Sequence, residues 1–359
     1  MGKGIKIPVG LILKPPIASD SFVRGNGALG VTDGLGHAEA NGGGGKTWVF
    51  DAGVWTIATN KAKGTPAEGA PIMGGDTLNG NMETGDPPTG WNPLLGSVLD
   101  GVADERTGGA GAQSCEATRG TDATVGYRSA ATTVGIWYKG TAWLKNISGT
   151  AAYLQLAGMA YGDTSGYAGP TWAQTVKCDR ATGVSCIIRL GIAGAVNNVA
   201  RFDDFIVAPL TLSSLFSSLQ AGTTNCKVRA KISALTTGTQ AGVVARLDIA
   251  AAPANFIIAY MDGTNVKIDE CVAGVYAALG TAAKAFAADG EIELHLSGTA
   301  WRCYHITSAG VATLIASGVT NVVTGNLHGL FSTYTSNTFG GFQCWSTGDE
   351  GQYAALDDL

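Results

Sequence analysis

Short runs in which apolar and polar residues alternate dominate the last third of the chain. Across residues 291–297, Ile292, Leu294 and Leu296 share one side of an extended backbone and Glu291 lies on the other, as in a half-solvated antiparallel strand. Ten short strand-like runs, at roughly 8–12-residue spacing, predict an antiparallel sandwich or barrel, and the run 255–261, apolar on both faces, is expected to be central. They are residues 226–234, 242–248, 255–261, 265–271, 274–279, 291–297, 300–307, 311–317, 328–334 and 340–345.

A helical period occurs once. Apolar residues at positions 212, 215, 216 and 219 predict a short amphipathic helix over residues 210–219. Elsewhere β-branched and aromatic runs are separated by turn residues, as in Asp262-Gly263. The pattern therefore predicts an all-β protein with at most one short helix.

The middle of the chain has its own series of expected strands. They cover residues 113–118, 124–129, 134–138, 151–157, 171–178 and 184–191. Trp143 falls between two of them, which predicts that it lies in a loop.

Composition and charge exclude several classes of partner and location. Only 14% of residues are charged, and 23 basic residues against 28 acidic ones give a net charge of −5. Since nucleic-acid binding needs clustered Lys and Arg, no nucleic-acid partner is expected. No apolar run approaches the roughly 20 residues that span a bilayer, so no membrane insertion is expected. Pro8 interrupts the one apolar stretch near the N-terminus, which argues against a secretory signal.

The seven cysteines include no C-x-x-C pair, so they fit neither a zinc site nor a disulfide scaffold. A bridge between Cys178 and Cys186 across a short hairpin is one reading. The other, which is favoured, is that all seven are reduced and packed in strands as small apolar side chains.

Two family resemblances appear along the chain. Phe22, Trp48, Trp55 and the runs around Asn255-Phe256 and Trp301 resemble the concanavalin-A-like lectin/glucanase jelly roll over residues 19–75 and 210–359. The segment 76–209 is similar to carbohydrate-binding modules of the family 4/9 type. That similarity rests on Asn79-Gly80, Glu83, Gly85 and Trp91 at its start, Thr171-Trp172 within it, and Asp203-Asp204-Phe205 at its end.

The resemblances imply two antiparallel jelly-roll β-sandwiches, the second inserted into a surface loop of the first. Residues 1–18 are left as an N-terminal arm. The arm is expected to add as a strand to a neighbouring subunit; the alternative is that it packs along its own domain.

Four aromatic residues of the inserted module are candidate glycan contacts, because sugar CH faces stack on aromatic rings. They are Trp137, Tyr138, Trp143 and Trp172, and burial in the core is the alternative for each. The resemblance also implies a structural calcium at Glu83 with Asp203 or Asp204, where the first and last strands meet. The alternative is that these carboxylates cap backbone N–H groups.

Catalysis is not expected. Glu291-Ile292-Glu293 is the nearest match to the Glu-x-Asp-x-x-Glu strand of the glucanases, and it lacks the central Asp and the last Glu. Solvated-face charges are the favoured interpretation of this pair, and the sequence contains no G-x-S-x-G elbow.

These inferences predict a non-catalytic surface protein of a virion, namely a capsid-decoration, fibre or receptor-binding part of a tailed bacteriophage. Its partners would be other virion proteins, copies of itself and host-surface glycans, and its location the virion assembled in the host cytoplasm. The alternative is a secreted or cell-surface bacterial polysaccharide-binding protein.

Overall fold

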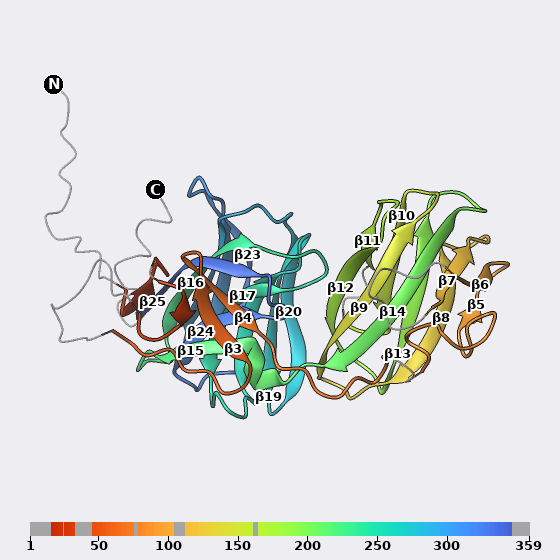
Figure 1. Cartoon of the computed structure of the whole chain (residues 1–359). Helices are drawn as coiled ribbons and strands as arrows, with labels where there is room; N and C mark the ends of the chain where they lie inside the picture. Colours follow the sequence, from red (N-terminus) through yellow and green to blue (C-terminus); the bar gives the residue numbers. More distant parts are fainter. Residues whose placement is uncertain are drawn as a thin grey trace, which may run out of the picture.

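The computed structural model describes residues 16–23, 25–32, 45–74, 78–103, 112–160 and 164–346. They form two β-sandwiches that lie side by side (Figure 1). Every strand pairing among these residues is antiparallel. The predicted all-β class with two antiparallel sandwiches is confirmed.

The larger sandwich consists of a nine-stranded and a six-stranded sheet. The first has the order β2-β3-β4-β25-β16-β21-β22-β23, with β1 also paired to β25, and the second the order β15-β24-β17-β18-β19-β20. The nine strands are β1 (Ala18–Asp20), β2 (Gly27–Ala28), β3 (Val54–Ala58), β4 (Lys61–Thr65), β16 (Cys226–Ala234), β21 (Gly290–Ser297), β22 (Ala300–Ile306), β23 (Ala312–Val319) and β25 (Thr338–Ser346). The six are β15 (Phe216–Gln220), β17 (Ala241–Leu247), β18 (Phe256–Met261), β19 (Asn265–Val272), β20 (Val275–Ala283) and β24 (Leu327–Ser332).

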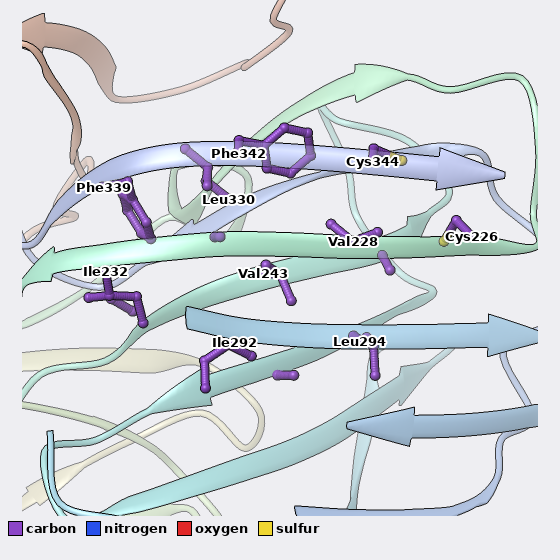
Figure 2. Close-up of a cluster of buried hydrophobic side chains, with 14 of the residues drawn as sticks. Cys226, Val228, Ile232, Val243, Ile292, Leu294, Leu330, Phe339, Phe342 and Cys344 are labelled. Carbon is purple, nitrogen blue, oxygen red and sulfur yellow. The ribbon is translucent and has the colours of Figure 1, made fainter. Parts of the chain in front are cut away.

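Alternation places the core of this sandwich between its two sheets. Ile292 and Leu294 of β21 and Val228 of β16 point inward and meet Val243 of β17 and Leu330 of β24 (Figure 2). All five side chains are fully buried. The faces predicted for residues 291–297 are therefore confirmed.

The smaller sandwich consists of two five-stranded sheets, with the orders β12-β9-β14-β7-β6 and β11-β10-β13-β8-β5. The first contains β6 (Val98–Val102), β7 (Ser114–Thr118), β9 (Trp137–Asn146), β12 (Ala173–Arg180) and β14 (Val199–Pro209). The second contains β5 (Asn92–Pro93), β8 (Thr124–Ala131), β10 (Ala151–Ala157), β11 (Thr164–Tyr167) and β13 (Ser185–Ala193).

The smaller sandwich is inserted between β4 and β15 of the larger one. The chain enters and leaves it side by side, through isolated bridges of Glu68 with Leu210 and of Met73 with Val207. Further in, the N–H of Phe205 donates to the carbonyl of Gly80 at 2.7 Å. The two ends of the insertion thus meet in space, while its predicted limits at residues 76 and 209 stay predictions.

A shared apolar cluster joins the two sandwiches, and Trp137 of β9 lies at its centre. Its ring centroid lies 5.6 Å from that of Phe331 and 6.3 Å from that of Tyr260, both on the outer side of the six-stranded sheet. The indole N–H donates to the hydroxyl of Tyr276 at 3.2 Å. Trp137 is only 1% exposed, so it packs as an interior residue of the whole molecule.

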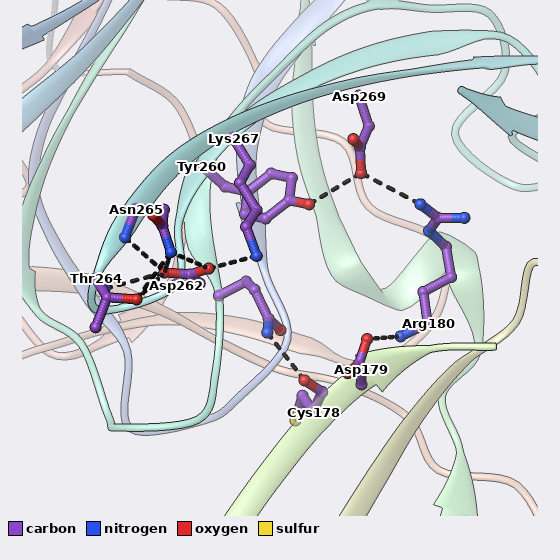
Figure 3. Close-up of polar contacts among 10 residues, drawn as sticks. Cys178, Asp179, Arg180, Tyr260, Asp262, Thr264, Asn265, Lys267 and Asp269 are labelled. Carbon is purple, nitrogen blue, oxygen red and sulfur yellow. Dashed lines mark hydrogen bonds and ion pairs between the residues drawn. The ribbon is translucent and has the colours of Figure 1, made fainter. Parts of the chain in front are cut away.

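Polar contacts surround this cluster (Figure 3). Arg180 of β12 pairs with the carboxylate of Asp269 at 3.4 Å, and the Tyr260 hydroxyl donates to the same oxygen at 2.9 Å. The side-chain amide of Gln240 donates to the carbonyl of Cys178 at 2.9 Å. Because a buried Arg and a buried Asp each need a partner, this pair fixes the orientation of the sandwiches.

Most of the expected strands form. All ten runs predicted in the last third correspond to β16 through β25, and residues 226–234 match β16 to the residue. The helix predicted over 210–219 is wrong: a single 3-10 turn, Leu212–Leu215, leads directly into β15. Strand pairing of β15 with β24 satisfies its backbone and overrides the local helical period.

All seven cysteines are free and buried. Cys178 of β12 belongs to the cluster between the sandwiches, and Cys186 of β13, in the opposite sheet, belongs to the core of the smaller sandwich, so the two thiols lie in different clusters. Burial raises the pKa of the Cys186 thiol to about 11. The reduced state favoured by the sequence is confirmed.

The structure describes only the last residues of the predicted N-terminal arm. Residues 1–15 of the predicted arm lie outside the described residues, and Ala18–Asp20 pairs with β25 as β1.

Among the described residues no helix is long and apolar enough to cross a bilayer.

A buried imidazole couples the stability of the larger sandwich to pH. His328 Nδ1 accepts the backbone N–H of Arg246 at 3.0 Å, and its Nε2–H donates to the carbonyl of Thr223 at 2.9 Å. Burial, together with the charge of Arg246, lowers the pKa of His328 to about 4. The bond from Arg246 requires the neutral ring, because a protonated Nδ1 cannot accept a hydrogen bond.

Replacing Trp137 with Ala should lower the free energy of unfolding by about 3–5 kcal/mol, because it leaves a cavity between the sandwiches. Denaturant titration measures the change. Trp143→Ala on the same strand, whose ring is partly exposed, is the control and should cost about 1 kcal/mol or less. Equal losses in both variants would contradict this assignment of Trp137.

Acid should destabilise the protein through His328. The unfolded imidazole takes up its proton near pH 6.5 and the folded one near pH 4, so stability is fully present above about pH 6.5 and falls as the pH drops to 4. The linkage amounts to about 3 kcal/mol. In His328→Asn the pH dependence should be flatter, although His305, whose pKa burial also lowers, keeps part of it. An unchanged slope would refute the role of His328.

Candidate functional site

The outer face of the sheet β12-β9-β14-β7-β6 gathers the polar and aromatic side chains of the smaller sandwich. Along β9, Ala142 and Leu144 point into the core and are fully buried. Trp143 and Lys145 therefore point outward, and both are partly exposed. Trp143 lies within β9, so the prediction that it lies in a loop is wrong.

Strand register arranges this face in two rows that cross the strands. In the first row Lys145 lies opposite Arg201, Arg201 opposite Glu116, and Glu116 opposite Asp100. In the second row Trp143 lies between Gln174 of β12 and Asp203 of β14. Side chains directly opposite on neighbouring strands have Cβ atoms about 5 Å apart. We call these seven residues, together with Trp172, the tryptophan face.

Trp172 lies just before β12 and completes the first row. The next residue, Ala173, pairs with Leu144, which brings Trp172 beside Lys145. The Lys145 ammonium lies 5.9 Å from the centre of the Trp172 ring, within cation–π range. Among the described residues the Trp172 indole N–H is buried and has no hydrogen-bond partner.

The other two predicted aromatic contacts are wrong, because their side chains are buried. Trp137 packs between the sandwiches, and Tyr138 points into the core of the smaller one with 3% exposure. The Tyr138 hydroxyl accepts the N–H of Thr133 at 2.9 Å. Neither ring has a face open to a sugar.

The predicted calcium residues occupy separate hydrogen-bonding roles. The carboxylate of Glu83 accepts the N–H groups of Ala112 and Gln113 at 2.9 and 3.0 Å, the capping role that was the alternative. Asp203 accepts the N–H of Asp204 at a β-bulge of β14. Among the described residues no three His, Cys, Asp or Glu side chains form a group that could hold a metal ion. Calcium binding stays a prediction without support from this geometry.

A second polar feature lies on the outer face of the nine-stranded sheet. Two adjoining cavities of about 230 and 330 Å³ share Arg229, Lys231 and Glu291 in their lining. We call them the charged groove. Glu293 lines one of them, so the groove contains both carboxylates of the glucanase-like strand.

These carboxylates are held as ion-pair partners. Arg229 donates to Glu293 and lies 3.4 Å from Glu291, and His295 Nε2–H donates to Glu293 at 2.6 Å. Burial alone would raise the pKa of Glu293, but His295 and the charges of Arg229 and Lys227 lower it to about 2. A general acid in glycoside hydrolysis needs a raised pKa instead.

Sequence reasoning missed the polar residues of the tryptophan face. Lys145, Arg201 and Glu116 each lie between two buried neighbours, so an outward position could be inferred for each one, whereas the burial pattern around Gln174 does not alternate. Their position beside one another on four strands depends on register, and the period of a single strand does not contain that information.

No protein-family model and no curated protein matches the chain. Among solved structures, it is similar to the CBM22-1 xylan-binding domain of Paenibacillus barcinonensis Xyn10C, at 17% identity over 40% of this chain and 96% of that one, with a TM-score of 0.31. It is also similar to the carbohydrate-binding module CBM66 from Bacillus subtilis, at 15% identity over 36% of this chain and 81% of that one, with a TM-score of 0.29. The CBM22-1–CBM22-2 tandem of the same Xyn10C matches at 12% identity over 79% of this chain and 100% of that one, with a TM-score of 0.30. Sequence identities and TM-scores this low identify no shared family.

Proposed function

We propose that this protein is a non-catalytic, secreted or cell-surface polysaccharide-binding protein, and that a glycan lies on its tryptophan face. The observation that carries the proposal is the outward position of Trp143, between Gln174 and Asp203 on the neighbouring strands. An aromatic ring stacks on the CH face of a sugar, and the exposed side-chain amide of Gln174 beside it is placed to bond a hydroxyl.

The shape of the site suits an extended chain. Five strands about 4.8 Å apart give a surface roughly 20 Å wide. The first row crosses the whole sheet from Trp172 to Asp100, and the second row crosses β12, β9 and β14. A polysaccharide running across the strands would contact several residues of the face at once.

The two other functions considered have weaker grounds. The ion pairs of the charged groove favour a protein without hydrolytic activity, since Glu293 is ionised and covered by Arg229. The virion role predicted from the sequence has no observation among the described residues that bears on it. It stays a prediction, as do self-association and the assignment of a cellular location.

Trp143→Ala and Trp172→Ala should each weaken glycan binding about tenfold or more, since loss of one stacked ring removes about 1–2 kcal/mol. Affinity electrophoresis in gels containing soluble xylans, glucans or mannans, followed by calorimetry on the best ligand, measures the effect. Trp345→Ala removes a partly exposed tryptophan from the larger sandwich and is the matched control. Unaltered binding in both tryptophan-face variants, or no binding by the unmodified protein, would refute the proposal.

The protein should release no reducing sugar from any polysaccharide that it binds. Glu291→Gln and Glu293→Gln should leave this result and the binding affinity unchanged, because neither carboxylate belongs to the tryptophan face. Sugar release that disappears in either variant would show that the charged groove is an active site.

A further inference from the structure

The sheet β11-β10-β13-β8-β5 carries another group of aromatic and polar side chains on its outer side, opposite the tryptophan face. Ile188 and Leu190 of the central strand β13 point into the core, so Arg189 between them points outward. Register places Tyr127 of β8 on one side of Arg189 and Gln155 of β10 on the other. These three outward side chains are partly exposed.

Tyr153 of β10 adds a flat aromatic ring to this face. It lies opposite Gly191 of β13 and Gly166 of β11, so neither neighbouring strand places a side chain beside it. A Cβ atom on Gly191 would lie 1.8 Å from Cζ and 2.3 Å from the hydroxyl oxygen of the ring. The ring therefore lies across the backbone of Gly191, while Tyr153 remains partly exposed. We call the following residues the tyrosine face: Tyr127, Tyr153, Gln155 and Arg189.

Arg189 is a cation without a carboxylate partner among the described residues. Its side chain donates from Nη1 to the amide oxygen of Gln155 at 3.3 Å. None of the residues in the five strands of this sheet is an Asp or a Glu. Arg128, the other basic residue of the sheet, donates to the carbonyl of Thr89 at 2.7 Å. The charge of Arg189 is therefore not neutralised within its own sheet.

The charged residues beside the sheet do not change the sign of this face. Burial raises the pKa of the Tyr153 hydroxyl, Asp122 adds to the rise, and Arg119 opposes it. These two flanking charges offset each other, which leaves Arg189 as the net charge of the face. The whole chain carries −5, so a positive centre attracts an anion locally against the field of the rest of the molecule.

The chemistry of the tyrosine face suits an acidic sugar. A guanidinium donates hydrogen bonds in a planar fork that matches a carboxylate. An aromatic ring stacks on the CH side of a pyranose ring. Tyr153 and Arg189 are diagonal neighbours on adjacent strands, at about 7–8 Å between backbones. A uronate carries its carboxylate directly on the pyranose ring, so one sugar residue can reach both side chains.

We propose that the tyrosine face is a separate carbohydrate site, which binds an acidic glycan with a uronate carboxylate on Arg189 and the sugar ring on Tyr153. Tyr127 and Gln155 then hydrogen-bond the sugar hydroxyls on either side of the carboxylate. This inference goes beyond the proposed function, because it concerns the opposite sheet and needs neither Trp143 nor Trp172.

The test uses glycan pairs that differ only in charge. Immobilised oligosaccharides of galacturonate, glucuronate and mannuronate are compared with the same oligosaccharides after reduction of their carboxylates to primary alcohols. Neutral xylan, glucan and mannan fragments are placed on the same array. The unmodified protein should bind the acidic member of at least one pair about tenfold more tightly, and added salt should reduce that preference.

Three variants address the tyrosine face. Arg189→Gln and Tyr153→Ala should each weaken binding to the acidic member about tenfold and change binding to neutral fragments less than about twofold. Gly191→Ala keeps the ring and the charge but displaces the ring from the sheet, and it should weaken acidic binding several-fold.

Two controls accompany these variants. Arg302→Gln on the exposed face of β22 removes the same charge from the larger sandwich and should have no effect. Thermal melts check that each variant is folded. If Gly191→Ala does not fold, the partly exposed Arg189 position decides the test.

Each remaining outcome has a definite meaning. Equal binding to both members of every pair, absence of acidic binding, or acidic binding that Arg189→Gln leaves unchanged would overturn the tyrosine face as a site for acidic glycans. The proposed function is decided separately, by the neutral fragments and the tryptophan-face variants, so either idea can fail while the other stands.

Discussion

The contact between Trp137 and the six-stranded sheet is the constraint on which the arrangement of the molecule depends. The smaller sandwich joins the chain through two adjacent strands, and such a connection alone would leave it free to swing. The buried indole, the Tyr276 hydroxyl and the Arg180–Asp269 pair fix its orientation. A large apolar contact combined with a paired buried charge makes two sandwiches behave as one body.

The same contact divides the outer face of β9 into two parts. Trp137 and Trp143 share that face and lie six residues apart, about 20 Å along an extended strand. The end near Trp137 is covered by the larger sandwich, and the end near Trp143 remains open to solvent. One strand thus supplies both the interface and the candidate binding site, and the distance between the two rings keeps the site clear.

The charged groove and the tryptophan face differ in the side chains that accompany their charges. In the charged groove Arg229, Glu291, Glu293 and His295 satisfy one another, which stabilises β16 against β21 and leaves little for a ligand. On the tryptophan face Arg201 and Glu116 form a similarly tight pair. The tryptophan face differs from the groove in carrying two partly exposed aromatic rings, Trp143 and Trp172, beside its polar groups.

The sequence by itself determined most of the strands and the faces of β21, because alternation and turn residues act over a few neighbouring positions. The division into two sandwiches was implied by the family resemblances. It also singled out Trp143 and Trp172. It did not distinguish them from Trp137 and Tyr138, because burial depends on which surface packs against a strand. Register across β9, β14, β7 and β6 decided which charges meet, and the packing of one sandwich on the other decided which tryptophan remained open. Both are properties of contacts between distant segments, so only the tertiary structure contains them.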